Sequence, residues 1–232
     1  MVEAGMSEHR YHTPAELDQA LCDYISQQLS DAVAARGSAS LVVSGGSTPK
    51  GLFQLLTKSE LPWHCITVML ADERWVPTDH ADSNEKMVRE LLLQGQASAA
   101  TFISLVSDYP DEQQNLASVT ANLAGLGTFD VVVLGMGGDM HTASLFPCSP
   151  ELENGLTTAD SALMTHPTTA PHARISLSRQ RLANTRHGLI HIVGDDKRAV
   201  LNSAIGRSPL EAPIAAFATP DGDFDIWFAP KN

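Results

Sequence analysis

Short runs of apolar residues alternate along the chain with longer stretches that have the amphipathic spacing of helices. The apolar runs lie at residues 40–43, 65–71, 102–105, 129–134, 174–177, 189–193 and 225–229. Strands that alternate with helices in this way are typical of a mainly parallel sheet. The pattern therefore predicts an α/β fold, with a doubly wound, Rossmann-like sheet that carries helices on both faces.

The clearest strand is 129–134, because an unbroken run of Val and Leu is typical of a strand buried on both faces. After the first apolar run, Thr48 is a candidate helix cap and Pro49 suits the first helical turn. We predict further helices that begin at Ser83 and at Pro110, the second of them reaching about residue 126.

Residues 147–173 contain four prolines and many Thr and Ala residues, which predicts a long surface connection. The chain has no internal repeat and no low-complexity tract. We therefore expect a single domain spanning residues 1–232. His9 and His12 have a spacing that can suit a metal on a helix, but they fall in an amino-terminal segment that we expect to be mobile, so no metal site is predicted there.

The charge balance narrows the range of partners. The 27 acidic residues outnumber the 15 Lys and Arg residues, so the formal net charge is −12 at pH 7. Proteins that bind nucleic acid hold its phosphates mainly with clustered Lys and Arg. We expect no nucleic-acid partner, and any phosphate group must be bound by a local site.

Cysteine usage and hydropathy indicate the setting. The three cysteines, Cys22, Cys65 and Cys148, include no Cys-x-x-Cys pair, which favours a reducing compartment and inert packing roles. No run approaches the roughly 18 apolar residues that a membrane span needs, and the amino terminus lacks an apolar leader. The sequence predicts a cytoplasmic protein that does not enter the membrane, and we expect a monomer.

Three strand ends carry residues suited to chemistry, and open α/β sheets bind ligands beyond the carboxyl ends of their strands. The first end consists of Ser44, Gly45, Gly46, Ser47 and Thr48. Small residues and hydroxyls before a helix can surround an anion with backbone amides. Leu52 stands where a Walker A loop has its Lys, which excludes that nucleotide-binding loop. The same residues also fit a tight turn before a capped helix.

The second strand end carries three charged residues, Asp72, Glu73 and Arg74. An Arg can bind a phosphate through two hydrogen bonds, while an adjacent acid acts as a base or orients a hydroxyl. Three charges in a row also fit a solvated turn.

The third strand end brings Asp139 and His141 together in a Gly-rich turn. Histidine accepts a proton near pH 7, and a neighbouring carboxylate can orient the ring, which is typical of hydrolases and isomerases. Met140 stands where a dinucleotide fingerprint needs Gly, so we expect no nicotinamide cofactor. A lone histidine here also fits a structural turn.

Other polar residues are weaker candidates. Lys197 follows a strand and can reach a phosphate as a point charge, and Arg174 and Arg179 flank a short strand. Ser144 lacks the Gly-x-Ser-x-Gly elbow of an activated serine nucleophile. A solvated Lys in the first turn of a helix remains an alternative for Lys197.

Three motifs occur in order along the chain: SGGSTP at 44–49, DERWVP at 72–77 with Ser83 and Asn84 after it, and GMGGDMHTASLFP at 135–147. In combination, with RISL at 174–177 and GDDK at 194–197, they resemble the 6-phosphogluconolactonases, relatives of the glucosamine-6-phosphate deaminases and isomerases. The resemblance implies a doubly wound parallel sheet, a place in the oxidative pentose phosphate pathway, and hydrolysis of 6-phospho-D-glucono-1,5-lactone without a cofactor or metal.

The resemblance also implies roles for individual residues. The 44–48 loop, Arg74 and Lys197 would hold the phosphate of a sugar lactone. His141 would be the base that takes a proton from the attacking water, with Asp139 orienting its ring. Asp72 would bind sugar hydroxyls or support the base.

Two residues depart from the usual family turn, which reads Gly-Met-Gly-Pro-Asp-Gly-His. Gly138 replaces Pro and Met140 replaces Gly; a left-handed backbone at position 140 would cost about 1 kcal/mol for Met. A non-catalytic sugar-phosphate-binding protein is therefore one alternative. The other is a glucosamine-6-phosphate deaminase, but that branch has a Glu five residues after the His, where this chain has Phe146.

Overall fold

The computed structural model describes residues 6–107, 111–220, 222 and 224–231. In chain order the strands are β1 (Glu8–Arg10), β2 (Ala39–Val43), β3 (Ile66–Leu70), β4 (Asp72–Arg74), β5 (Thr101–Ile103), β6 (Phe129–Leu134), β7 (Ala162–Thr165), β8 (Arg174–Leu177), β9 (Thr185–Val193) and β10 (Phe224–Ala229). The α-helices are α1 (Pro14–Arg36), α2 (Lys50–Leu56), α3 (Asn84–Leu91), α4 (Glu112–Ala124), α5 (Leu152–Thr157), α6 (Arg179–Ala183) and α7 (Asp195–Ala204).

A parallel sheet forms the centre of the described molecule. Seven of the described strands pair in the order β1-β10-β9-β6-β2-β3-β5, and every neighbouring pair is parallel. The chain runs outward from β2 in one direction and from β6 in the other, so the topological switch point lies between β2 and β6. The predicted fold class, a doubly wound and mainly parallel sheet, is confirmed.

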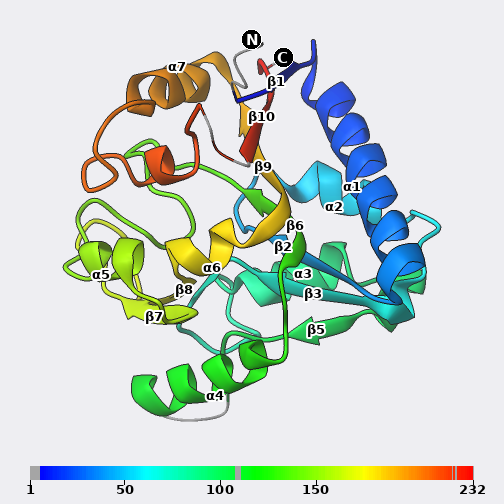
Figure 1. Ribbon diagram of the computed structural model, residues 1–232, viewed down its shortest axis with the longest axis horizontal. Helices are drawn as coiled ribbons and strands as arrows, with labels where there is room; N and C mark the ends of the chain where they lie inside the picture. The colour runs from blue at the N-terminus through cyan, green and yellow to red at the C-terminus, as the bar shows by residue number, and fades with distance from the viewer. Residues whose placement is uncertain (1–5, 108–110, 221, 223, 232) are drawn as a thin grey trace.

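Helices cover both faces of this sheet (Figure 1). Helix α1 packs on β2, β6 and β10, whereas Figure 1 shows α5, α6 and α7 on the opposite side. The six residues of β6 are all buried, as expected for a central parallel strand. The buried apolar residues of the described chain form one continuous core.

Helix α1 is the longest described helix, and its apolar spacing explains its position. Buried side chains recur every three or four residues from Leu17 to Ala32, which gives one apolar face against the sheet. The side chain of Thr13 caps the first turn by accepting from the amide of Glu16, and Gly37 ends the helix in the left-handed conformation at φ 79°.

A second, smaller sheet of antiparallel strands has the order β4-β8-β7. Its strand β4 begins two residues after β3 ends, so the chain passes directly from the large sheet into the small one. The cross-strand neighbours of Asp72 and Arg74 are Ser176 and Arg174. The alternative that Asp72, Glu73 and Arg74 form a solvated turn is therefore wrong, since they form an edge strand of the small sheet.

Three local predictions also need correction. Helix α2 is capped by Pro49, with no hydrogen bond from a side chain, so Thr48 is not its cap. Residues 147–173 contain α5 and β7 rather than a plain connection. His9 lies in β1, which pairs with β10, and the aromatic ring of Trp227 stacks on it at 4.1 Å, so the segment is ordered. The predicted helix start at Pro110 lies outside the described residues.

Candidate active site

A cavity of about 280 Å³ opens at the carboxyl ends of the central strands. It lies at the switch point between β2 and β6, where a doubly wound sheet is expected to bind its ligand. The predicted site residues that line it are Ser44, Gly45, Gly46, Ser47, Thr48, Asp72, Arg74, His141, Arg174 and Lys197. These residues come from five separate segments of the chain, which meet at one opening.

The 44–48 loop forms one wall of this cavity. The hydroxyl of Ser44 donates to the carbonyl of Val133 at 2.8 Å, which ties the end of β2 to β6. Position 45 requires glycine because the side chain of Asn84 packs against its backbone: a Cβ there would lie 2.1 Å from Oδ1 of Asn84. Gly46 has a φ of 94°, which favours glycine. Among the described residues, no acceptor is recorded for the amides of residues 45–48, so these amides are free to bind an anion.

Two arginines face each other across the small sheet at the cavity. Arg74 and Arg174 are direct cross-strand partners of β4 and β8. Like charges at such positions repel, and an anion between them removes the repulsion. Arg74 donates from Nη1 to the carbonyl of Asp82 at 2.8 Å and to Oδ1 of Asn84 at 3.2 Å. Burial lowers the pKa of Arg174, but a guanidinium keeps its charge at neutral pH.

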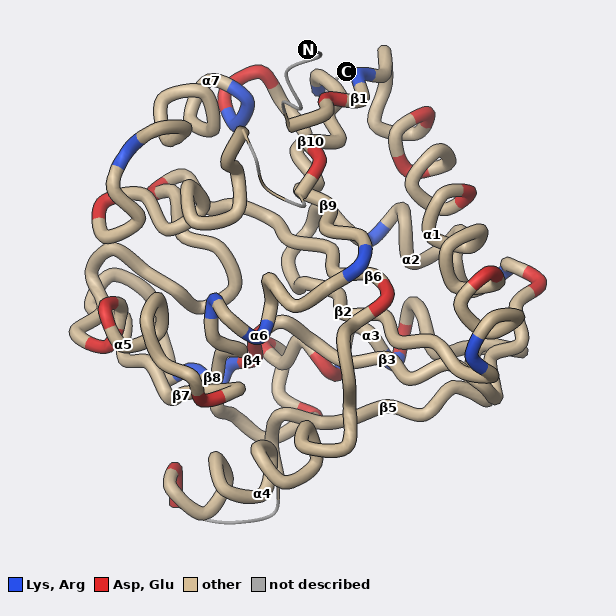
Figure 2. The backbone as a smooth tube through the Cα atoms, in the orientation of Figure 1, with Lys and Arg blue, Asp and Glu red and all other residues tan. Residues whose placement is uncertain are grey.

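Basic residues are concentrated locally despite the acidic composition. Figure 2 shows several Lys and Arg positions near β4 and β8, beside the acidic residues of β4 itself, and further acidic positions spread over α1, α5 and other surface elements. Lys197 adds a third cation from the first turn of α7, and its Nζ donates to the carbonyl of Met136 at 3.2 Å. The cavity therefore has a local positive charge suited to a phosphate.

His141 lies in the turn that follows β6. Its Nδ1 and Oδ1 of Asp139 are 2.5 Å apart, and its backbone amide donates to the same oxygen at 3.2 Å. The hydrogen bond with His141 lowers the pKa of Asp139, so this carboxyl is ionised at neutral pH. In the neutral ring, Nδ1–H donates to Asp139 and Nε2 keeps its lone pair. The pair therefore has the arrangement of a general base with its orienting acid.

The imidazole of His141 is also held by two neighbours. It stacks on the ring of Phe146, with centroids 4.1 Å apart and planes inclined by 20°. A Cβ at Gly137 would lie 2.1 Å from Nδ1, so only glycine leaves room for the ring. Met140 has a φ of 69°, so the position does require a left-handed backbone. The turn nevertheless keeps the hydrogen bond between His141 and Asp139.

Asp72 and Ser144 form a buried pair next to the cavity. The hydroxyl of Ser144 donates to Oδ2 of Asp72 at 2.5 Å. Ser144 is fully buried, so it is not an exposed nucleophile. Among the described residues, no hydrogen bond is recorded between Asp72 and His141. The prediction that Asp72 supports the base directly therefore has no contact in its favour. Arg179, the other residue left open, does not line this cavity.

Sequence reasoning missed two residues that shape the site. The carboxylate of Glu73 is buried and accepts from the amides of Asn84 at 2.8 Å and Glu85 at 2.7 Å, which fixes the start of α3. Burial raises its pKa. Asn84 then bridges Arg74 and the Gly45 loop. The only signal was the serine and asparagine that follow the 72–77 motif.

His191 is a further unpredicted residue at the floor of the cavity. It lies on β9 and is 3% exposed, and burial lowers its pKa to about 4, so the ring is neutral. Its Nε2 is 3.5 Å from Oδ1 of Asp18 on α1. An isolated histidine within an apolar strand gave no sign that it would reach the cavity.

The fold and the cavity together define an α/β protein whose switch-point cavity is suited to a small anionic ligand. The chain belongs to the family described as glucosamine-6-phosphate isomerases/6-phosphogluconolactonase, whose family model matches residues 12–227. The resemblance drawn from the motifs is thereby confirmed.

Individual relatives carry the second of these two names. The chain is 40% identical to the 6-phosphogluconolactonase of Neisseria meningitidis, over 89% of this chain and 91% of the relative. It is 38% identical to that of Pseudomonas putida, over 98% and 94% respectively. The crystal structure of a 6-phosphogluconolactonase from Shewanella baltica matches with a TM-score of 0.94 and 44% identity, over 98% of this chain and 99% of that one.

A crystal structure titled as a monomeric glucosamine-6-phosphate deaminase matches with a TM-score of 0.79 at 17% identity, which shows the shared fold alone. No helix among the described residues is long and apolar enough to cross a membrane.

Proposed function

We propose that this protein is a 6-phosphogluconolactonase, which hydrolyses 6-phospho-D-glucono-1,5-lactone to 6-phospho-D-gluconate in the oxidative pentose phosphate pathway. The observation that carries the proposal is the hydrogen-bonded pair of His141 and Asp139 in the same cavity as Arg74, Arg174 and Lys197. A base and a group of cations in one small cavity match a substrate with a reactive carbonyl and a phosphate.

The phosphate is bound by the 44–48 loop together with the three cations. The free amides of the loop and the facing pair of Arg74 and Arg174 supply hydrogen bonds and charge, and Lys197 adds a point charge. Charge-assisted hydrogen bonds of this kind contribute about 1.5–3 kcal/mol each. With the phosphate bound in this way, the lactone ring lies in the same cavity, next to His141.

Hydrolysis requires one proton to move twice. Nε2 of His141 takes a proton from water as the water oxygen bonds to the lactone carbonyl carbon, which gives a tetrahedral oxyanion. Asp139 stabilises the imidazolium through Nδ1. The oxyanion then collapses, the bond from carbon to the ring oxygen breaks, and Nε2 returns its proton to that oxygen. This scheme needs no cofactor, metal or covalent intermediate.

The deaminase reaction is less compatible with this site. Opening an amino-sugar ring needs an additional acid or base near the histidine, and the candidate position holds Phe146, whose apolar ring stacks on His141. A non-catalytic binding protein would keep the phosphate groups without turnover. Ammonia release from glucosamine 6-phosphate and binding without turnover distinguish these two alternatives from a lactonase.

We also propose that residues 1–232 act as one sugar-phosphate domain and that the protein is a cytoplasmic monomer with a small-molecule substrate. The cavity volume of about 280 Å³ suits one small molecule. Light scattering behind gel filtration measures the mass, and a mass near 50 kDa would refute the monomer.

Acid release from freshly prepared lactone tests the activity, with the unaided opening of the lactone subtracted. We expect His141→Asn to lower kcat by at least about 100-fold while 6-phosphogluconate binds with unchanged affinity. His64→Asn is the matched control, because the side chain of His64 is exposed and does not line the cavity. Turnover by His141→Asn at the rate of the control would refute the assigned base.

A further inference from the structure

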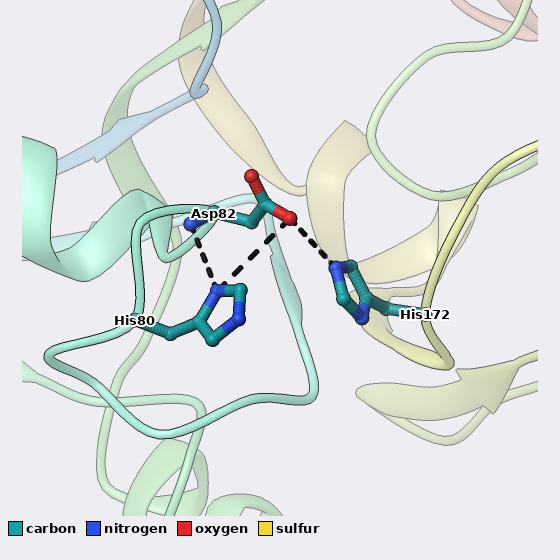
Figure 3. A group of neighbouring side chains, drawn as sticks. All are labelled: His80, Asp82 and His172. Carbon is teal, nitrogen blue, oxygen red and sulfur yellow. Dashed lines mark hydrogen bonds and ion pairs between the residues drawn. The ribbon is translucent and has the colours of Figure 1, made fainter.

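Outside the proposed active site, three metal-ligating side chains lie together on two loops (Figure 3). His80 and Asp82 belong to the loop between β4 and α3, and His172 lies just before β8. One ligand atom from each residue lies within 4.8 Å of those of the other two. Asp82 and His172 are 90 positions apart, so no local motif pointed to this group.

The distances among these atoms are close to those of a metal site. Nε2 of His172 is 2.8 Å from Oδ2 of Asp82, and Nδ1 of His80 is 4.0 Å from the same oxygen. Metal bonds of 2.0–2.1 Å at tetrahedral angles separate ligand atoms by about 3.3 Å. The two observed separations lie on either side of that value, and the ligand atoms of His80 and His172 lie within 4.8 Å of each other, so rotations of the side chains can bring all three residues onto one cation.

The hydrogen bonds already present at this cluster can be exchanged for metal bonds. Nε2 of His172 bonds to Asp82, and the amide of Asp82 donates to Nδ1 of His80 at 3.0 Å. A cation binds when Nε2 of His172 gives up its proton and the lone pair of His80 turns from the amide to the metal. The side chains are 26–51% exposed, so water can fill the remaining coordination positions.

The backbone at His172 supports a specific purpose for this residue. Its φ is 69°, a left-handed conformation that costs a residue with a side chain about 1 kcal/mol or more. In this conformation the imidazole of His172 forms its hydrogen bond with Asp82 on the other loop. Unfavourable backbone conformations of this kind concentrate at functional positions.

We propose that His80, Asp82 and His172 form a binding site for one divalent transition-metal cation, with Zn²⁺ the preferred ion, which joins the β4–α3 loop to the segment before β8. Two imidazoles and one carboxylate suit Zn²⁺, whereas Mg²⁺ and Ca²⁺ prefer an all-oxygen set. The proposal does not depend on the proposed lactonase activity.

The cation would hold the two loops that adjoin the strands of the facing arginines. Asp82 accepts from Arg74 through its backbone carbonyl at 2.8 Å, and His172 is two residues from Arg174. Metal bonds at these loops therefore restrict the chain next to both guanidinium groups without replacing any of their hydrogen bonds.

Titration calorimetry with ZnCl₂ tests the site, using protein without a polyhistidine tag. We expect one equivalent of Zn²⁺ to bind, and His172→Asn and His80→Asn each to weaken this binding by about tenfold or more. Asn suits both substitutions. At position 172 it tolerates the left-handed backbone, and at position 80 its side-chain oxygen can accept the hydrogen bond from the amide of Asp82. A tenfold excess of Zn²⁺ over its Kd should raise the Tm of the wild type by about 3–6 °C, and MgCl₂ should not.

Two further histidines paired with carboxylates serve as matched controls. His166 bonds to Glu112 and Glu151, and His141 bonds to Asp139. His166→Asn and His141→Asn should each retain the one-equivalent site with unchanged affinity. The proposal is overturned if Zn²⁺ binds the two cluster variants as tightly as the wild type, if binding is lost in a control instead, or if the wild type binds no Zn²⁺.

Discussion

Gly137 allows a sharp test of how the base is positioned. A Cβ at this residue would lie 2.1 Å from Cε1 and Nδ1 of His141 and 2.8 Å from Oδ1 of Asp139. Ordinary contact begins near 3.4 Å, so in Gly137→Ala the imidazole has to move by more than 1 Å. A displacement of about 1 Å in a reacting group can cost about 100-fold in rate. We therefore expect kcat for lactone hydrolysis to fall by about 100-fold.

The neighbouring glycine provides the control for this experiment. At Gly138 the nearest atom to an added Cβ is Nζ of Lys197, 4.0 Å away, and the backbone φ is not positive. Gly138→Ala should keep kcat within about twofold of the wild type. Both variants should bind 6-phosphogluconate normally, because neither substitution touches the 44–48 loop or the arginines.

Initial rates of acid release, measured across lactone concentrations, give kcat and KM separately for the two variants. Thermal unfolding of each variant shows whether the fold is intact. Equal kcat values for folded Gly137→Ala and Gly138→Ala would refute the argument that the glycine fixes the imidazole.

Three more outcomes can be measured. At position 140, Met140→Gly should be about 1 kcal/mol more stable to denaturant than Met140→Ala, since both remove the side chain but only Ala is strained at φ 69°; equal stabilities would refute the strain. Hydrogen bonds to Glu151 and Glu112 raise the pKa of His166, so its stabilisation is complete below pH 6.5 and is lost as the pH rises through the raised pKa. His166→Gln should therefore destabilise the protein by about 1 kcal/mol or less at pH 6 and by a smaller amount at pH 9, as followed by urea unfolding; a larger cost at pH 9 would contradict this sign. Arg74→Ala should raise KM by about 10- to 100-fold with little change in kcat, and an unchanged KM would remove Arg74 from the phosphate site.

The site was accessible from the sequence because a parallel sheet brings the carboxyl ends of its strands to one edge. Once the runs at 40–43 and 129–134 were recognised as parallel strands, the residues that follow them had to meet. The pair of Asp139 and His141 needed only one intervening residue, so local spacing was sufficient to predict their contact.

Other features depend on contacts between distant segments. Asp72 to Arg74 form a strand only because β8, a hundred positions later, supplies their antiparallel partner. The role of Glu73 depends on the helix start that it binds at Asn84. Short elements such as α5 and β7 were hidden by a composition rich in Pro, Thr and Ala, whose local preferences were overridden by packing.

The sheet order has a consequence for how the protein is made. Strand β1, close to the start of the chain, pairs with β10, close to its end, and β2 pairs with β6 about 90 residues later. During synthesis β1 has no native partner until β10 has left the ribosome, and the cavity lacks Lys197 until the first turn of α7 has been made. Pairings this distant in sequence slow folding and leave strand edges exposed in partly made chains. Strand β1 is therefore the strand of the described sheet that waits longest for its partner, and it is the part of the nascent chain that a chaperone would protect.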